Sequence, residues 1–286
     1  MSRLPRALPV FVEKTRSAGM LCRRYVREVP ALGVVASSKV FLAEASARRP
    51  LSNLVHGLAP HFLTITPAGY WRPLTLRRLG SDVDVVRQML VREEYRPIGS
   101  LAGINLILDC GANIGAAAYY LLHRYPSARL IAVEPDPRNH ALCERNLAAF
   151  GARVTVIRAA VWSECRPLRI VPESRAVGEW GLRVEPAADG DVDGVTIAEL
   201  LDRCRAKLPI DILKMDIEGA ETEVFRGRHT WLGDTRYIAI ELHGPVARET
   251  FDAALASFRY EQYESHETTF ASNLQLNGEH GRLLFR

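Results

Sequence analysis

The 286-residue chain carries 37 Lys and Arg against 33 Asp and Glu, which gives a formal net charge of +4, and 48% of its residues are hydrophobic. This composition is ordinary for a soluble globular protein, and the length fits one large domain or a core domain with an N-terminal appendage. The positive charge is too small to predict a nucleic-acid partner.

The five cysteines are scattered, and no two of them form a C-x-x-C pair. We therefore expect neither a zinc site nor a disulfide framework, and we expect the protein to lie in a reducing compartment. No apolar run reaches the ~18–20 residues that cross a bilayer. The first residues also lack the pattern of a signal peptide. We therefore expect a cytoplasmic protein.

Residues 1–60 open with a basic bias and are interrupted by prolines. The pattern predicts a mostly helical appendage whose arginines face the solvent. Apolar residues between the arginines, such as Leu21 and Val26, leave open an amphipathic helix that contacts a membrane surface or a partner.

Residues 61–103 form a lead-in region that we expect to cover one side of the core. Its strands are rich in β-branched residues and its helix carries apolar residues on one face. The expected elements are a strand at 62–66, a turn at 67–69, a strand at 74–76, and a helix that is N-capped at Ser81–Asp82, runs towards Glu94–Tyr95 and ends before Pro97.

In residues 104–286 apolar strands alternate with helical segments, which predicts a parallel sheet with helices on both faces. We expect an α/β fold, a doubly wound, mostly parallel, Rossmann-like sheet with the N-terminal helical and strand appendage. The main strands are expected at 104–108, 129–133, 154–157, 210–215 and 237–240. Further expectations are a strand at 168–171 beside the 154–157 strand, a mobile loop at 172–194, and antiparallel strands in the tail that include residues 283–285.

Polar residues follow the expected parallel strands at their carboxyl ends, where open α/β sheets bind their ligands. These residues are Asp109, Glu134, Asp216, Glu241 and His243. So many acids at one edge exceed what a purely structural sheet needs, because each of them must be solvated or paired.

The turn after the first of these strands favours one nucleotide class over others. A dinucleotide loop would place glycine where Asn113 stands, and a phosphate-binding P-loop would continue with Lys and Ser or Thr. What remains is Asp109, Gly111, Asn113 and Gly115, followed by Glu134 at the second strand end. Glu134 would accept hydrogen bonds from ribose hydroxyls, and Asp109 would meet a cationic amino end. The sequence therefore predicts S-adenosylmethionine as the ligand.

At this point the sequence resembles the FkbM-type family of class I S-adenosylmethionine-dependent methyltransferases. The resemblance covers roughly residues 74–245 and rests on four blocks: Asp109–Gly115, Val133–Pro135, Leu213–Glu221 and Ile240–His243. It implies a class I methyltransferase core and O-methylation of a hydroxyl, with sugars and polyketide-like alcohols among the family's acceptors.

Methyl transfer to an alcohol requires alignment and a base that removes the hydroxyl proton. Asp216 is the first candidate base. His243 is the second, because an unperturbed imidazole pKa near ~6.5 suits neutral pH. Lys214 would share the sheet face of Asp216 and orient it or hold the acceptor oxygen. We interpret Glu221 as a first-turn helix acid.

A divalent metal is not required by this chemistry, although the chain offers a set of hard ligands for one. That set consists of Asp216, Glu218, Glu241 and His243.

Acceptors other than a small-molecule or glycan hydroxyl fit less well. The turn Asp216–Gly219 lacks the prolines and the aromatic residue of enzymes that methylate nucleobase amines, so no nucleic-acid partner is expected. Two alternatives of another class stay open at this point. One is a non-catalytic member that keeps the fold as a binding scaffold, and the other is a nicotinamide-dependent oxidoreductase.

Overall fold

The computed structural model describes residues 8–47, 61–78, 80–172 and 182–276. The chain divides into two compact units, residues 1–92 and residues 93–286. Among the described helices, none combines the length and the apolar character that a membrane-crossing segment requires.

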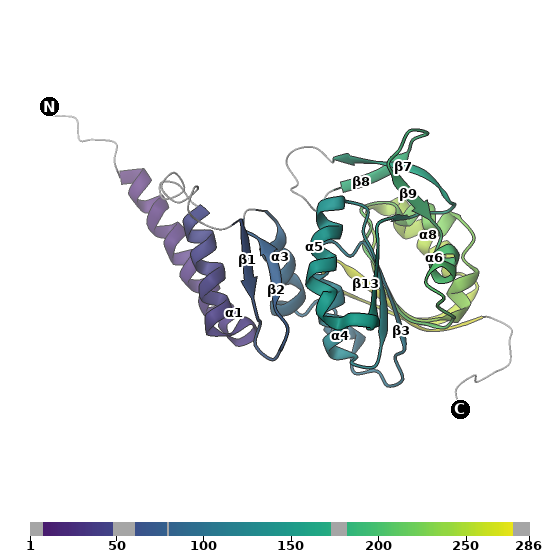
Figure 1. The fold of residues 1–286 in the computed structure, drawn as a ribbon, viewed down its shortest axis with the longest axis horizontal. Coiled ribbons are helices and arrows are strands. Elements are labelled where there is room, and N and C mark those ends of the chain that lie inside the picture. Colours follow the sequence, from purple (N-terminus) through teal and green to yellow (C-terminus); the bar gives the residue numbers. More distant parts are fainter. Residues whose placement is uncertain (1–7, 48–60, 79, 173–181, 277–286) are drawn as a thin grey trace. The chain divides into compact units, whose positions relative to one another are not determined.

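The first unit contains a long helix, a β-hairpin and a short helix (Figure 1). These elements are α1 (Leu8–Ala47), β1 (Phe62–Ile65), β2 (Leu74–Arg77) and α3 (Asp82–Val86). Helix α1 is interrupted at Gly33, whose φ of 79° lies outside the helical region. Strands β1 and β2 pair antiparallel, which confirms the predicted hairpin.

Helix α3 is shorter than predicted, and it begins differently. Ser81 makes no side-chain cap. Instead, the buried carboxylate of Asp82 accepts hydrogen bonds from the backbone N–H of Arg77 (2.7 Å) and from its guanidinium (2.6 Å). The chain then continues as a π-helix over Arg87–Val91. Glu93, with a φ of 50°, ends the helical run.

Seven strands form the main sheet of the second unit, in the order β12-β13-β11-β10-β3-β4-β5. The five strands from β11 to β5 run parallel, and β13 pairs antiparallel with both β11 and β12. The chain order reverses between β3 and β10, which is where such sheets bind ligands. The strands are β3 (Leu106–Cys110), β4 (Arg129–Val133), β5 (Val154–Ile157), β10 (Ile210–Met215), β11 (Thr235–Glu241), β12 (Phe258–Ser265) and β13 (Thr268–Leu276).

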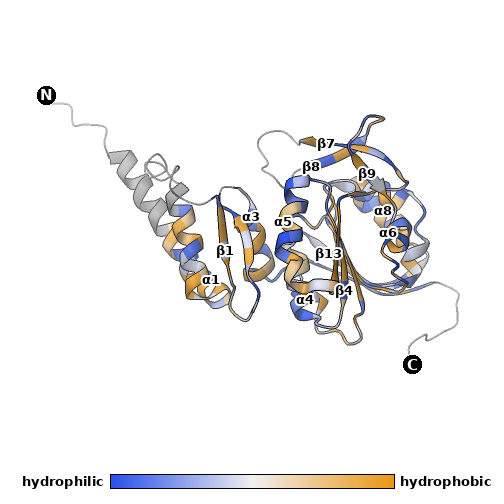
Figure 2. Cartoon of the chain, in the orientation of Figure 1, coloured by the Kyte–Doolittle hydropathy of each residue, from blue (hydrophilic) through white to orange (hydrophobic). Residues whose placement is uncertain are grey.

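Helices cover both faces of this sheet, with α4 and α5 on one face and α6 and α8 on the other (Figure 1). Every residue of β3 is buried, as expected for a strand covered on both sides. Figure 2 shows hydrophobic residues along the central strands and hydrophilic ones on the helices. The doubly wound α/β fold is therefore confirmed. The helices are α4 (Ala116–Arg124), α5 (Pro137–Leu147), α6 (Ile197–Arg203), α7 (Glu221–Arg226) and α8 (Pro245–Leu255).

Two predicted helix starts are confirmed at the atomic level. Asp136 caps α5 by accepting the N–H groups of Arg138 (3.0 Å) and Asn139 (2.9 Å). The Thr196 hydroxyl accepts the N–H of Glu199 (3.1 Å) at the start of α6. Both side chains satisfy N–H groups that have no partner within the helix.

A second sheet corrects two predictions. It has four strands in the order β6-β9-β7-β8, namely β6 (Ala160–Val161), β9 (Val192–Val195), β7 (Arg166–Pro172) and β8 (Leu182–Pro186). Strand β7 pairs with β8 and β9, so residues 168–171 do not pair beside β5. The loop predicted at 172–194 holds β8 and part of β9, because apolar and polar residues alternate in β8 despite the flanking glycines and acids. Residues 173–181 and the predicted strand at 283–285 lie outside the described residues.

Candidate active site

The parallel strands place the predicted site residues at one edge of the sheet. Lys214 pairs with Asp109 across β10 and β3, and Cys110 pairs with Val133 across β3 and β4. The residues that follow these strands, Glu134 and Asp216, therefore lie at neighbouring strand ends. Glu241 ends β11, the next strand along the sheet.

The glycine turn after β3 is shaped by close approaches within the chain. Gly111 and Gly115 have φ angles of 78° and 82°, and Asn113 has a φ of 50°. A Cβ atom at Gly111 would lie 1.7 Å from the carbonyl oxygen of Asp216. A Cβ atom at Gly115 would lie 3.0 Å from the Sγ of Cys143. Gly111 is therefore required because the turn after β10 packs directly on it.

Glu134 holds this turn from the tip of β4. Its carboxylate accepts the backbone N–H groups of Asn113 (2.8 Å) and Asp136 (3.0 Å). Burial raises the pKa of Glu134 to about 7, although these N–H groups oppose the shift. The Asn139 side chain also donates a hydrogen bond to this carboxylate, which leaves it one spare lone-pair site. The buried Oδ1 of Asn113 has no hydrogen-bond partner among the described residues. These spare acceptors fit the hydroxyl groups of a nucleoside ribose.

Asp109 and Lys214 form a buried ion pair beneath the turn. The Lys214 ammonium lies 3.1 Å from Asp109 Oδ1 and donates a hydrogen bond to the carbonyl of Gly111 (2.6 Å). Neither side chain is more than 4% exposed. Burial raises the pKa of Asp109, although the positive charge of Lys214 opposes this shift. Burial alone would lower the pKa of Lys214, but Asp109 holds it well above its usual value. Asp109 thus anchors the turn through its ion pair with Lys214.

His243 lies among four carboxylates. Its Nδ1 is 3.2 Å from the buried Glu221 Oε1. The distances from its Nε2 are 3.3 Å to Glu218, 3.5 Å to Glu241 and 4.0 Å to Asp216. This cluster brings together the residues predicted at the ends of β10 and β11.

The charges of the cluster change the expected protonation states. Burial alone would lower the pKa of His243, but the hydrogen bond to Glu221 and the charges of Glu221, Asp216 and Glu218 raise it to about 9. The ring is therefore charged at neutral pH, which differs from the expectation of a neutral base. Burial and the charge of Asp216 raise the pKa of Glu241 to about 8.

Three side chains of the cluster also satisfy the geometry of a metal site. The ligand atoms of Asp216, Glu241 and His243 all lie within 4.8 Å of one another. Two carboxylates and an imidazole suit a divalent ion of the first transition row or Mg²⁺. Glu218, the fourth predicted ligand, lies against His243 and is not part of this trio.

Sequence reasoning missed two partners of the site. Glu221 is a first-turn residue of α7, as interpreted from the sequence, but it also accepts the N–H of Ile217 (2.9 Å) and holds His243. Tyr95 is buried, and burial raises its pKa well above its usual value beside the charges of Lys214 and Asp216. The position of Glu221 in the same block as Asp216 was the available signal. No such signal pointed to Tyr95, because this residue precedes the core strands in the chain.

The chain was compared with known proteins. The model of the methyltransferase FkbM domain matches residues 109–265. The chain is 31% identical over 184 residues to 2-O-methyltransferase NoeI of Sinorhizobium fredii, covering 58% of this chain and 72% of that protein. It is 24% identical over 207 residues to hexuronic acid methyltransferase AglP of Haloferax volcanii, covering 72% of this chain and 80% of that protein. It is 31% identical over 163 residues to methyltransferase sdnD of Sordaria araneosa, covering 46% of this chain and 62% of that protein.

The family model thus spans more than half of the chain and includes the glycine turn, Glu134, Asp216 and His243. The Sordaria match spans less than two thirds of that relative, whereas the other two matches span more. The chain therefore belongs to the FkbM methyltransferase family and is an S-adenosylmethionine-dependent methyltransferase.

Proposed function

We propose that this methyltransferase transfers the methyl group to a hydroxyl of a sugar or glycan, or of a secondary-metabolite alcohol. Two relatives support this, because their names specify 2-O-methylation and methylation of a hexuronic acid. The observation that carries the proposal is the position of Asp216. Its carboxylate is 32% exposed at the tip of β10, and its backbone packs on the glycine turn.

The methyl donor would be held by Asp109, Gly111, Asn113, Gly115 and Glu134. Glu134 and the Asn113 side chain accept hydrogen bonds from the ribose hydroxyls, for which they have spare lone pairs. Asp109 and Lys214 act as positioning residues, since their ion pair fixes the turn from below.

The bound sulfonium supplies an electrophilic methyl group for an in-line displacement by the acceptor oxygen. Asp216 takes the hydroxyl proton as the new O–C bond forms, so no free alkoxide has to develop. His243 is charged at neutral pH and a poor proton acceptor in this state. Its role is to hold the carboxylates of Glu218 and Glu241 in place, with Glu221 fixing the ring from the other side.

A metal-assisted variant of this mechanism is the second candidate. The trio Asp216, Glu241 and His243 supports it by the close spacing of its ligand atoms. A divalent ion there would hold the acceptor oxygen and lower the pKa of the hydroxyl. His243 would then be a neutral ligand, and the hydroxyl proton would pass to Glu218, the carboxylate of the cluster outside the trio.

The test is release of S-adenosylhomocysteine with a panel of hydroxylated sugars and natural products. Asp216→Asn should lower kcat by about 100-fold or more, the usual contribution of a general base, and should leave donor binding intact. Asp193→Asn is the matched control, because this acid on β9 is 76% exposed. Unchanged turnover in Asp216→Asn would exclude Asp216 as the base.

A chelator separates the two mechanisms. Loss of turnover with EDTA and its recovery with Mg²⁺ would support the metal-assisted variant. Full turnover in EDTA would support direct proton transfer to Asp216.

A further inference from the structure

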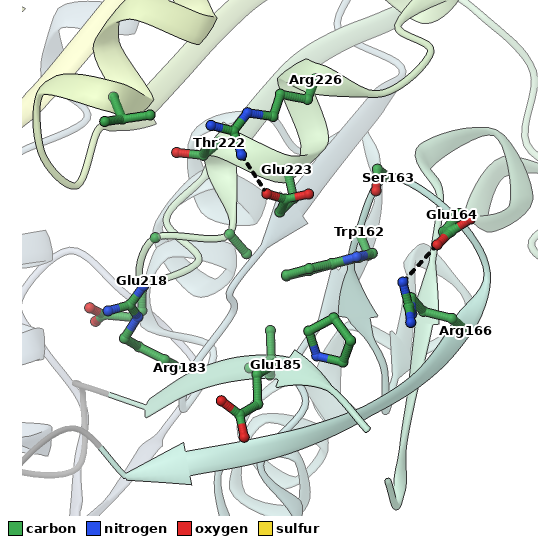
Figure 3. A pocket seen from close by; sticks show the side chains of 15 residues that line it. Trp162, Ser163, Glu164, Arg166, Arg183, Glu185, Glu218, Thr222, Glu223 and Arg226 are labelled. Carbon is green, nitrogen blue, oxygen red and sulfur yellow. Dashed lines mark hydrogen bonds and ion pairs between the residues drawn. The ribbon is translucent and has the colours of Figure 1, made fainter. Parts of the chain in front are cut away.

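A pocket of about 520 Å³ lies between the second sheet and the start of α7 (Figure 3). Its volume falls within the ~300–1,000 Å³ that small-molecule sites span. Residues 162–166 line one side and residues 183–186 of β8 line another. The turn at Glu218–Ala220 and the first residues of α7 complete it.

The turn from Asp216 to Gly219 lies between this pocket and the glycine turn after β3, which we propose holds the methyl donor. On one side, the carbonyl of Asp216 fills the position that a Gly111 side chain would occupy. On the other side, a Cβ atom at Gly219 would lie 3.4 Å from Nη2 of Arg183, which lines the pocket. Glu218 lines the pocket as well and contacts His243 at 3.3 Å. Asp216 is not among the residues that line the pocket, and Glu218, two residues further on, is the member of the cluster that faces it.

The backbone of this turn is strained where it meets the pocket. Glu218 has a φ of 54° and Gly219 a φ of 97°. A left-handed conformation at a residue other than glycine is strained, and such strain is concentrated at functional sites. Here it turns the Glu218 carboxylate towards His243 and the Arg183 guanidinium, beside which it lies in Figure 3.

The lining mixes hydrogen-bond donors and acceptors around one aromatic ring. Arg166 pairs with Glu164 (2.8 Å) and Arg226 with Glu223 (2.9 Å), so charges of both signs lie on the walls. Ser163 and Thr222 add hydroxyls, and the Trp162 side chain forms part of the pocket (Figure 3). A sugar ring presents hydroxyls around its rim and C–H groups on its face. Paired charges and hydroxyls match the rim. Trp162 is 7% exposed and packs in a core cluster with Leu168 and Val192, so only a small part of its ring meets the sugar face.

An apolar alcohol would fit this lining poorly. It would desolvate the guanidinium and carboxylate groups without replacing their hydrogen bonds to water, and each such group costs free energy when it is left unpaired. A ligand with a large net charge is also disfavoured, since four glutamates and three arginines line the pocket together.

We propose that this pocket binds the glycosyl unit of the acceptor, so that the substrate is a hydroxyl-rich ring and not an apolar alcohol. The inference rests on the proposed O-methyl transfer and deepens it by selecting one of its acceptor classes. Arg183, Thr222 and Trp162 are then specificity-determining residues, and Asp216 remains the base in the turn whose Glu218 and Gly219 line the pocket.

Kinetics with defined acceptors test this proposal. The probes are methyl β-glucoside, methyl β-glucuronide and cyclohexanol, a six-membered ring with a single hydroxyl. Arg183→Gln and Thr222→Val should each raise KM for the methylated glycoside by about tenfold, the equivalent of one hydrogen bond to a charged or well-placed group. The Kd of S-adenosylhomocysteine should stay unchanged. Arg203→Gln, an exposed arginine of α6 outside the pocket, should leave both constants at their normal values.

Binding is measured separately from turnover, so that the two proposals can fail independently. Titration of each glycoside into the complex with S-adenosylhomocysteine should show saturable binding that Arg183→Gln and Trp162→Phe weaken. Glycoside binding in the pocket without any methyl transfer would overturn the O-methyl transfer and, with it, the acceptor role of the pocket. Turnover of a glycoside with unchanged KM in all pocket variants, or a higher kcat/KM for cyclohexanol, would overturn the pocket proposal alone.

Discussion

At the scale of single residues, the pair Lys214–Asp109 shows how the site is held. Both side chains are almost fully buried, 3.1 Å apart, and the ammonium also binds the carbonyl of Gly111. Removing one partner of such a pair leaves an uncompensated charge in a region without water. The pair therefore links the stability of the sheet to the conformation of the glycine turn after β3.

Lys214→Met should accordingly lower the free energy of unfolding by about 3–5 kcal/mol, as measured by urea denaturation. Arg203→Met is the control, because it removes an exposed ion pair with Glu199 and should cost less than about 1 kcal/mol. If the two variants were equally stable, the buried pair would not anchor the turn.

The proposed contact of Glu134 with the donor should make donor binding depend on pH. Because burial raises its pKa to about 7, the side chain is neutral below that pH and ionised above it. Hydrogen bonds to an ionised carboxylate are roughly twice as strong as those to a neutral group. The apparent Kd for S-adenosylhomocysteine should therefore fall as pH rises from about 6 to 8, by up to about tenfold if only the ionised form binds.

Calorimetric titration across this pH range checks the prediction. Glu134→Gln should remove the pH dependence, and Glu134→Ala should weaken donor binding by about 1–3 kcal/mol at pH 8. A Kd that is independent of pH in the unmodified protein, or unchanged in Glu134→Ala, would contradict the ribose assignment.

At the scale of elements, the contact between the turn after β3 and the tip of β10 is the tightest in the site. Gly111→Ala would place a methyl group 1.7 Å from the carbonyl oxygen of Asp216 at a φ of 78°. The strands would have to separate, so we expect a loss of about 3 kcal/mol or more from overpacking and backbone strain. Donor binding should weaken in parallel.

Gly151→Ala is the matched control for this variant. Gly151 also has a positive φ of 60°, but no atom lies within 4 Å of its Cβ position. Only the backbone strain remains, which costs roughly 1–3 kcal/mol. Thermal and urea unfolding of the two variants measure how much stability each one loses. A larger loss in Gly111→Ala is the effect of the contact with Asp216, and equal losses would show that this contact is not tight.

The elements also show how far sequence patterns reach. The core strands and helices were predicted within a few residues, because continuous apolar runs, prolines and helix caps are local signals. The sheet formed by β6 to β9 was missed. Its short strands are stabilised by pairing with one another, and β8 and β9 lie in a stretch with glycines and acids that resembles a loop.

At the scale of the whole molecule, a ligand that binds only the folded state raises its melting temperature. S-adenosylhomocysteine at ~100 times its Kd should add about 2.7 kcal/mol to the stability of the unit that binds it, a shift of roughly 5–10 °C for a unit of this size. NAD should cause no shift, because the turn has Asn113 in place of the central glycine of a dinucleotide loop. The reverse pattern in differential scanning fluorimetry would contradict the assignment of the donor.

Taken by itself, the sequence determined the parallel sheet and the class of methyltransferase, and it predicted the edge of the sheet at which the site lies. These follow from local periodicity and from the residues that end each strand, such as Glu134 and Asp216. Tertiary structure alone decided which charges meet. It turned Lys214 towards Asp109, placed His243 among four carboxylates so that its pKa rises, and folded residues 183–186 into the wall of a pocket. The physical reason is that burial and the distances between charges depend on residues far apart in the chain, and no local pattern records them.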